Sequence, residues 1–183
     1  KAKEKSDSAV IVIGRSSGED RENVLKKGSF YLTDKEKKLI QNVTSVFKKT
    51  VLILNVGNVI DFEEIDAFGD KISAILVVWQ GGMESGNAVA DILSGKVNPS
   101  GKLTDTIAKT YEDYPSSKDF GKLKFNNYTE DIFVGYRYFE TFAKDRVLYE
   151  FGFGLSYTTF DVSFVNAEEK ENEIVFTAKV KNT

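Results

Sequence analysis

The stretch ISAILVVWQGGMESGNAVADILSGK (Ile72–Lys96) decides the fold, because it contains a strand, a loop and a helix in one run. Its first part, through Gln80, is continuously apolar rather than alternating, which is typical of a strand buried on both faces. Gly81 and Gly82 then indicate a turn, and the helical segment after them ends at Gly95. The stretch therefore predicts one β-strand followed by a helix that covers it.

The same order occurs twice before this stretch. AVIVIG (Ala9–Gly14) and TVLILNVGN (Thr50–Asn58) are also continuously apolar, so both predict buried strands. The segment between them, Leu32–Lys49, has apolar residues at helical spacing. IDFEEIDAFGDK (Ile60–Lys71) predicts a further short helix. Strand and helix thus alternate along the first half of the chain.

The helix within Leu32–Lys49 has a clear start. Thr33 and Glu36 have the spacing of a capping box, in which each side chain accepts a hydrogen bond from the backbone of the other. The apolar positions that should face the core are Leu39, Ile40, Val43, Val46 and Phe47.

Three successive strand–helix units predict an α/β fold, a three-layer sandwich in which a mostly parallel sheet is flanked by helices. In such sheets, ligands bind at loops that leave the C-terminal ends of the strands. Three segments qualify: GRSSGEDREN (Gly14–Asn23), NVGN (Asn55–Asn58) and QGGMESG (Gln80–Gly86). Each also fits a plain chain reversal.

The end of the chain has a different pattern. TFDVSFV (Thr159–Val165) and EIVFTAKV (Glu173–Val180) alternate apolar and polar residues, which predicts an antiparallel β-hairpin with one buried face. A lone hairpin is marginally stable in water, so we expect it to begin a truncated β-sandwich. The predicted organisation is an α/β domain over residues 1–157 and the first strands of a second domain over residues 158–183, with the chain as part of a longer polypeptide.

Composition excludes several classes of function. The 183 residues carry a formal net charge of −3, which gives no basic surplus for a nucleic-acid partner. Cysteine and histidine are absent, so a Ser-His-Asp triad, a Cys-His pair and a His-bearing zinc site are impossible within the chain. Proton transfer near neutral pH must then use carboxylates, lysine or tyrosine.

The sequence also bears on location. No apolar run approaches the roughly 20 residues needed to cross a bilayer, so no membrane partner is expected. KAKEKSDS (Lys1–Ser8) is charged and does not read as a signal peptide. Together with the absence of cysteine, which fits a reducing compartment without requiring one, this favours a cytoplasmic over a secreted location.

Four stretches, taken together, resemble the C-terminal α/β sandwich domain of glycoside hydrolase family 3, the family of many β-glucosidases. They follow the family's order from Ser8 to Phe160, and the terminal hairpin resembles the start of the fibronectin type III-like domain found in many members. The second and fourth are long and unusual in composition. The stretches are GRSSGEDREN with KGSFYLTDKE, VVWQGGMESGNAVADILSGKVNPSGKLTDTI, EDIFVGYRYFE and YEFGFGLSYTTF.

This resemblance implies a retaining glycosidase of several domains. A barrel domain of the same polypeptide would supply the aspartate nucleophile, and the present domain would lend the general acid/base. The family's Ser-Gly-Glu motif corresponds to Glu19 here. The implied substrates are β-linked oligosaccharides or aryl and alkyl glucosides, with β-xylosides as a further option. The chemistry needs no metal and no organic cofactor.

The residues around Glu19 leave a second interpretation open. Ser16 and Glu19 have capping-box spacing, so the pair could only start a helix. Asp20 and Arg21 follow Glu19 directly, whereas the family pattern has an additional glycine before the Asp-Arg pair. Arg21 is the candidate for orienting Glu19 or contacting an aglycone hydroxyl, although a solvated surface arginine fits as well. Asp20 is a second substrate-binding candidate, and Asp20 and Glu22 are alternative proton carriers.

Two other functions compete with the glycosidase. The same fold could serve as a non-catalytic scaffold or carbohydrate-binding module of a degenerate family member. It could also be a flavodoxin-like nucleotide-binding domain, although the Gly81-Gly82 turn lacks the spacing of known phosphate-binding loops. The aromatic residues Phe133, Tyr136 and Tyr138 are predicted to fill a core or a seam between domains rather than to stack on sugars.

Overall fold

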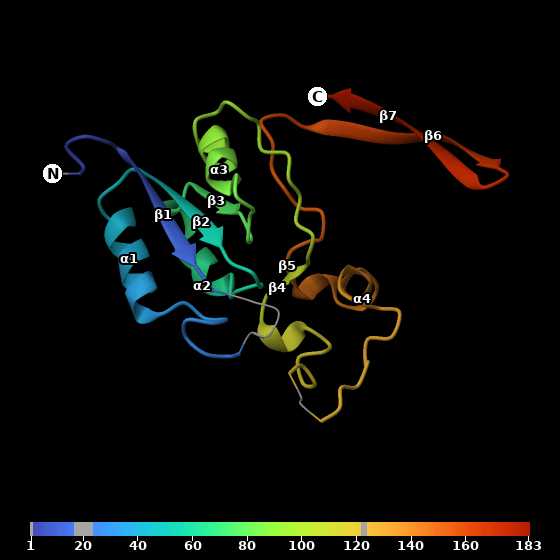
Figure 1. The fold of residues 1–183 in the computed structure, drawn as a ribbon, viewed down its shortest axis with the longest axis horizontal. Coiled ribbons are helices and arrows are strands. Elements are labelled where there is room, and N and C mark those ends of the chain that lie inside the picture. Colours follow the sequence, from blue (N-terminus) through green and yellow to red (C-terminus); the bar gives the residue numbers. More distant parts are fainter. Residues whose placement is uncertain (1, 17–23, 122–123) are drawn as a thin grey trace.

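A parallel three-stranded sheet forms the centre of the chain, in the order β1-β2-β3. The structure is a computed structural model that describes residues 2–16, 24–121 and 124–183 (Figure 1). The strands are β1 (Ser8–Gly14), β2 (Lys49–Asn55) and β3 (Ala74–Val77). Ile11 pairs with Leu52, and Leu52 pairs with Ile75, so β2 lies in the middle.

Helices alternate with these strands, as predicted. They are α1 (Asp34–Thr44), α2 (Glu63–Asp66) with the 3₁₀ turn η1 (Gly69–Lys71), and α3 (Ser85–Leu93). Figure 1 shows α1 beside β1 and β2, and α3 close to β3. This arrangement confirms the α/β sandwich with a parallel sheet.

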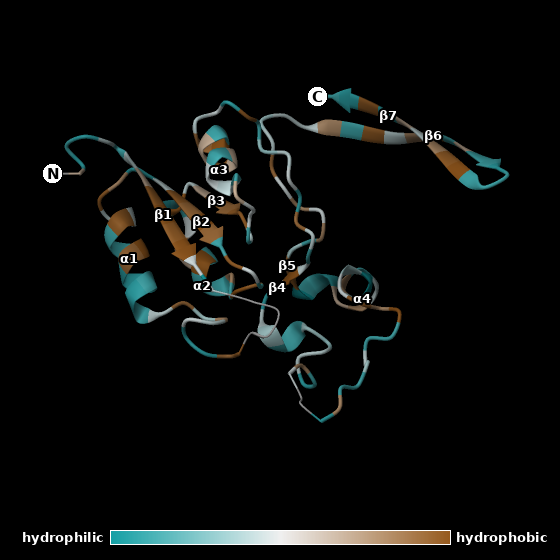
Figure 2. Ribbon diagram, in the orientation of Figure 1, coloured by the Kyte–Doolittle hydropathy of each residue, from teal (hydrophilic) through white to brown (hydrophobic). Residues whose placement is uncertain are grey.

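The main core lies between β2 and the helices. Leu52 and Leu54 of β2 are fully buried, and Ile40 of α1 and Ile65 of α2 belong to the same apolar cluster. Figure 2 shows the apolar residues concentrated on β1 and β2. The remaining buried members of the cluster are Ile11, Ile13, Leu32, Val56, Ile60, Phe62 and Ile107.

The prediction that β1 is buried on both faces is wrong. Ile11 and Ile13 are buried, but Val10 and Val12 on the opposite face are 51% and 58% exposed. Among the described residues β1 is an edge strand, and no helix of theirs packs over its second face. The β3 strand is also shorter than the apolar run Ile72–Gln80 that predicted it.

The predicted start of α1 is confirmed. Thr33 is the N-cap, the Thr33 hydroxyl accepts a hydrogen bond from Glu36 N at 3.2 Å, and the Glu36 carboxylate accepts one from Thr33 N at 2.7 Å. The helix ends at Thr44, so Val46 and Phe47 lie beyond it rather than on its stripe. Ile40 is the fully buried residue of the stripe.

A second, smaller cluster follows the sheet. Strands β4 (Ile107–Ala108) and β5 (Val147–Tyr149) pair antiparallel, and helix α4 (Tyr136–Phe142) precedes β5. Phe139 on α4 is buried together with Ala108 and Ala143. Phe139 is the buried residue of α4, whereas Phe133, Tyr136 and Tyr138, the aromatic residues predicted to fill a core or a seam, remain partly or largely exposed. Two 3₁₀ turns, η2 (Tyr111–Asp113) and η3 (Lys144–Arg146), complete this part.

Tyr114 connects the segments of the smaller cluster. Its hydroxyl donates to Thr106 O and accepts from Ala108 N, each at 3.0 Å. The ring meets Phe139 edge to face, with centroids 5.7 Å apart. Burial, followed by the charges of Asp105 and Asp113, raises the pKa of Tyr114 to about 12, although the Ala108 N–H opposes the shift.

This raised pKa predicts a loss of stability in alkali. The unfolded chain releases the Tyr114 proton near pH 10 while the folded chain retains it, so stability present below pH 10 falls as pH rises towards 12. Two pKa units correspond to about 2–3 kcal/mol. Urea titrations at pH 9 to 12 should show a shallower decline for Tyr114→Phe than for the wild type. The exposed Tyr128→Phe control should keep the wild-type slope, and equal slopes in all three proteins would contradict the prediction.

The segments around residues 101 and 154 approach each other closely. Leu103 N donates to Phe153 O and Gly152 N donates to Leu103 O, both at 2.8 Å. A Cβ added to Gly154 would lie 2.6 Å from Gly101 O, which leaves no room for a side chain. The glycines of the FGFG sequence therefore allow the chain to return beside the segment after α3.

The C-terminal hairpin forms as predicted, but its apolar face is exposed. Strands β6 (Phe160–Lys170) and β7 (Glu173–Asn182) pair antiparallel and extend away from the sheet (Figure 1). Apolar and polar residues alternate from Phe160 to Phe164 in β6, and apolar residues occupy every second position from Ile174 to Val180 in β7. Phe164 and Phe176, which were expected to be buried, are 69% and 70% exposed. The alternation specifies which face is apolar, and burying that face needs a partner layer that a hairpin does not contain.

Candidate functional site

The three predicted ligand loops begin at one edge of the sheet. Because β1, β2 and β3 are parallel and in register, their C-terminal ends lie side by side. Arg15 N donates to Asn55 O at 3.0 Å, and Val78 N donates to Leu54 O at 2.9 Å, which continues the pairing just beyond the strands. This edge is the candidate functional site.

The residues predicted to act at this edge lie outside the described part of the chain. Glu19, Asp20, Arg21 and Glu22 all fall within residues 17–23. The capping-box alternative for Ser16 and Glu19 is untested for the same reason. The roles of these side chains remain predictions.

Arg15, just before residues 17–23, makes several contacts at the end of β1. Its Nη1 donates to Gly14 O at 3.1 Å, and its Nε donates to Ser29 O at 3.4 Å. Its Nη2 donates to Glu36 Oε2 at 2.9 Å, while Nη1 also pairs with Glu36 Oε1. The two side chains are 11% and 19% exposed, so the ion pair is largely shielded from water.

The electrostatics of Glu36 follow from these contacts. Burial by itself would raise the pKa of Glu36, but hydrogen bonds from Arg15 and Thr33 and the charge of Arg15 lower it overall. Glu36 is therefore a stable carboxylate at neutral pH and not a proton donor. Glu36 completes the capping box of α1 and also forms an ion pair with Arg15 at the end of β1.

The loop after β2 brings a buried carboxyl to the same region. Asp61 is 8% exposed, its N–H donates to Phe30 O at 2.8 Å, and its Oδ1 accepts from Glu63 N at 2.9 Å. Burial, together with the charges of Glu64 and Glu63, raises the pKa of Asp61 despite this hydrogen bond. The loop thus fixes Asp61 to the segment that follows residues 17–23.

The loop after β3 has an unusual backbone. Trp79 has a φ of +55°, a conformation that bulky side chains rarely adopt, and its side chain packs against the main core. A Cβ on Gly81 would lie 2.3 Å from Ser85 Cβ, so a side chain at this position would clash with the start of α3. Met83 is fully exposed. Ser85 starts α3 and has no histidine in the sequence to activate it.

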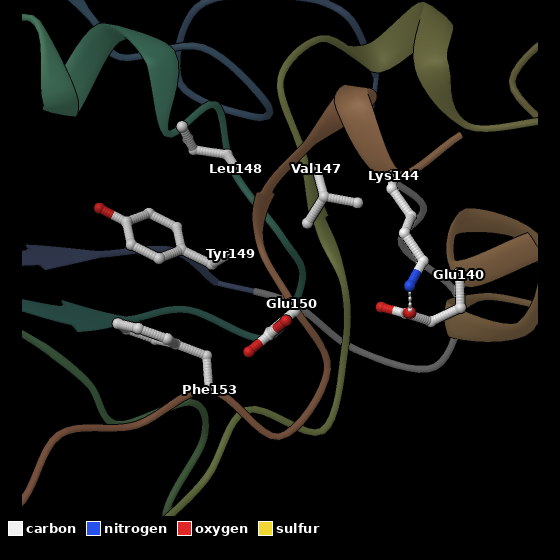
Figure 3. Close-up of a pocket in the computed structure, with 7 residues that line it drawn as sticks. All are labelled: Glu140, Lys144, Val147, Leu148, Tyr149, Glu150 and Phe153. Carbon is white, nitrogen blue, oxygen red and sulfur yellow. Dashed lines mark ion pairs between the residues drawn. The ribbon is translucent and has the colours of Figure 1, made fainter. Parts of the chain in front are cut away.

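A hollow of about 330 Å³ lies between α4 and β5. Figure 3 shows an ion pair between Lys144 and Glu140 on one side, with Nζ and Oε2 2.7 Å apart. The Tyr149 and Phe153 rings lie on the other side, with centroids 5.1 Å apart. The Tyr149 hydroxyl also donates to Asp66 Oδ1 at 3.0 Å. The hollow is lined by Glu140, Lys144, Val147, Leu148, Tyr149, Glu150 and Phe153.

Within residues 2–16, 24–121 and 124–183, no three acidic side chains gather in a way that could hold a metal ion. None of the helices in those ranges has the length and apolar character to cross a membrane.

The sequence analysis did not predict that Arg15 joins the end of β1 to Ser29 and to Glu36 of α1. The signal available was its position directly after an apolar strand, where a long charged side chain is held close to the sheet edge. Glu36 was recognised only as a cap, because the chain separation between Arg15 and Glu36 hides their contact from any local pattern.

Comparison with known proteins identifies the family. Residues 1–157 match the glycosyl hydrolase family 3 C-terminal domain. A β-glucosidase of Ruminococcus albus is 51% identical over 182 residues, which cover 100% of this chain and 19% of that protein. β-Glucosidase A of Butyrivibrio fibrisolvens is 46% identical over 188 residues, covering 89% of this chain and 22% of that protein.

Solved structures of β-glucosidases are similar to this chain as well. A β-glucosidase from Paenibacillus barengoltzii superposes with a TM-score of 0.90 at 46% identity, covering 100% of this chain and 20% of that one. β-Glucosidase 3B from Thermotoga neapolitana, solved in complex with α-D-glucose, gives a TM-score of 0.83 at 43% identity, covering 100% and 26%. The chain spans about a fifth of the length of these relatives. The chain belongs to glycosyl hydrolase family 3, and its residues 1–157 are the C-terminal domain of that family.

Proposed function

We propose that this chain is the accessory catalytic domain of a retaining β-glucosidase-like enzyme that hydrolyses terminal β-D-glucosides or β-xylosides. Glu19 acts as the general acid/base, and an aspartate nucleophile is supplied by a barrel domain of the same polypeptide. Arg21 orients Glu19 or contacts the aglycone, with Asp20 as a second substrate contact. The observation that carries this proposal is the match of the entire chain to a β-glucosidase at 51% identity.

The chemistry fits the residues that the chain contains. Cleaving a glycosidic bond with retention needs two carboxyl groups about 5–5.5 Å apart, one attacking the sugar and one transferring the proton. With no histidine in the sequence, a carboxyl group is the natural proton carrier. Glu19 follows β1 in the segment that leaves the C-terminal edge of the sheet, where α/β proteins place their ligands.

The aromatic and apolar residues between Ile132 and Phe151 support the proposal of a partner domain. Phe133 and Phe142 lie edge to face with centroids 4.8 Å apart, and Tyr136 and Phe151 stack at 4.6 Å. Ile132, Val134 and Phe142 nevertheless remain largely exposed. Exposed large apolar side chains in this segment suit docking of the proposed barrel.

The hairpin supports the proposed boundary at residue 158. The match to the family 3 C-terminal domain ends at residue 157, and β6 and β7 lie beyond it. We propose that residues 158–183 start a β-sandwich whose further strands bury the exposed face of β6 and β7.

The stereochemistry of hydrolysis tests this function. The full-length polypeptide containing this chain should hydrolyse 4-nitrophenyl β-D-glucoside or β-D-xyloside, and proton NMR should show the β-anomer as the first product. 4-Nitrophenyl α-D-glucoside serves as the control and should remain intact. Initial release of the α-anomer would contradict a retaining mechanism. No turnover of either β-glycoside would favour the scaffold or carbohydrate-binding alternative.

A further inference from the structure

The hollow between α4 and β5 combines flat apolar surface with charged groups. Its volume of about 330 Å³ falls within the range of about 300–1,000 Å³ that is typical of small-molecule sites. Figure 3 shows the Tyr149 and Phe153 rings on one side, the Lys144–Glu140 ion pair on the other, and the Glu150 carboxylate between them. The hollow therefore offers both apolar and polar contacts to a single ligand.

The aromatic side of the hollow is fixed by contacts within the protein. The Tyr149 hydroxyl donates to Asp66 Oδ1 at 3.0 Å, and the Tyr149 ring meets Phe62 edge to face with centroids 5.7 Å apart. In Figure 3 this hydroxyl points away from Lys144. Tyr149 thus presents its ring to the hollow, next to the ring of Phe153 at 5.1 Å between centroids. A surface that is already ordered loses little entropy when a ligand binds.

The polar side of the hollow provides both a donor and acceptors. Lys144 Nζ lies 2.7 Å from Glu140 Oε2. The hydrogen bond to Glu140, the charge of Glu140 and, to a smaller extent, the charge of Glu150 raise the pKa of Lys144, so its ammonium group stays charged at neutral pH. An ammonium group only donates hydrogen bonds, and a carboxylate only accepts them.

These groups favour a neutral ligand that is rich in hydroxyl groups. A hydroxyl both donates and accepts, so it can pair with a carboxylate and with an ammonium group. A cationic ligand would be repelled by Lys144, and an anionic ligand would be repelled by Glu140 and Glu150. The aromatic side adds a second requirement, because the negative face of an aromatic ring attracts C–H groups. A pyranose ring meets both requirements, since one of its faces presents C–H groups and its edges carry hydroxyls.

We propose that the hollow between α4 and β5 is a binding site for a neutral pyranose sugar. The C–H face of the sugar packs on the rings of Tyr149 and Phe153, and its hydroxyls bond to Glu140, Lys144 and Glu150. This site goes beyond the proposed function, because it cleaves no bond and uses no residue of the proposed catalytic machinery. The ligand is small and the polar groups face water, so we expect a Kd on the order of 1–10 mM.

Ligand-observed NMR of the full-length polypeptide tests the site. The catalytic centre is first blocked with 2-deoxy-2-fluoro-β-D-glucosyl fluoride, which traps a retaining glycosidase as its glycosyl-enzyme. Saturation-transfer titration with methyl β-D-glucoside should still give a Kd of about 1–10 mM, with the strongest transfer to the protons of one pyranose face. D-Glucuronate and protonated D-glucosamine should bind at least about threefold more weakly. Loss of methyl β-D-glucoside binding on blocking, or equal binding of the charged sugars, would contradict the proposal.

Variants locate the binding at the hollow. Phe153→Leu keeps an apolar side chain but removes the flat ring, and Glu150→Gln keeps the size of the side chain but removes its charge. Each should raise the Kd for methyl β-D-glucoside about five- to tenfold, since each removes one contact with the sugar. Thermal unfolding of both variants establishes that they are folded.

Lys144→Met removes the donor and should raise the Kd about fivefold. Its matched control is Lys96→Met, which breaks a similarly exposed ion pair with Asp91 and should stay within about twofold of wild type. An unchanged Kd in folded Phe153→Leu, Glu150→Gln and Lys144→Met would overturn the assignment of the site. Failure of the fluoride to trap the wild type, with the Kd still raised in these variants, would refute the retaining mechanism and leave the sugar site in place.

Discussion

Replacing Glu19 with glutamine should lower kcat/KM for alkyl β-glucosides by about 10²–10⁴-fold in the full-length polypeptide. The amide retains the size of the side chain but cannot protonate the leaving oxygen. Glycosides with good leaving groups should still form the glycosyl-enzyme, because their departure needs no proton. Their turnover should then stall, since the same carboxyl must activate water in the second step.

Azide distinguishes this mechanism from misfolding. A small anion needs no general base, so it should attack the glycosyl-enzyme of the Glu19→Gln variant and yield β-glucosyl azide, detectable by mass spectrometry. Asp20→Asn and Glu22→Gln are the matched controls and should lack azide rescue. Rescue in either control, with none in Glu19→Gln, would move the proton carrier to that residue.

Truncating Phe139 to alanine should destabilise the chain by about 3–5 kcal/mol. Phe139 is 1% exposed and packs edge to face on Tyr114 and Tyr138, so its removal leaves a cavity that α4 cannot easily fill. That loss is a large part of the 5–15 kcal/mol by which folded domains usually exceed the unfolded state. Urea denaturation of the chain, followed by circular dichroism, measures the change.

Phe142 on the same helix is the control for Phe139. It is 61% exposed, and its ring lies against those of Phe133 and Tyr138. Phe142→Ala should therefore cost only about 1 kcal/mol, the value of an aromatic pair. Equal destabilisation by the two truncations would show that the smaller cluster does not depend on Phe139.

The sequence was sufficient to predict the three parallel strands, the helices between them and the hairpin, because their signals are local, whereas α4, β4 and β5 were not predicted. Continuous apolar runs located β1, β2 and β3, and the Thr33–Glu36 spacing located the start of α1. Burial was predicted less well, since it depends on what lies over a surface. Val10 and Val12 belong to a continuous apolar run of the kind found in fully buried strands, yet their side chains are exposed. The apolar face of the hairpin likewise has the right alternation but no covering layer.

For the candidate site, the position of the loops could be predicted from the sequence, but the contacts between their side chains could not. Parallel strand order places the three loops at one edge, and that placement follows from the pattern alone. The pairing of Arg15 with Glu36 does not, because it requires the return of the chain from Ser29 into α1. The positive φ of Trp79 was also hidden, since nothing in a tryptophan side chain favours that backbone conformation.

The contrast between the two kinds of strand pairing has a consequence for how quickly the chain folds. In the hairpin, Lys170 pairs with Glu173, so β6 and β7 can close within about 1–10 μs without waiting for distant residues. In the parallel sheet, Ser8 pairs with Lys49, and the intervening segment must first be brought round before any rung of that ladder forms. On a ribosome, β1 therefore emerges before β2 and waits for it, whereas β6 and β7 can pair almost as soon as both are made.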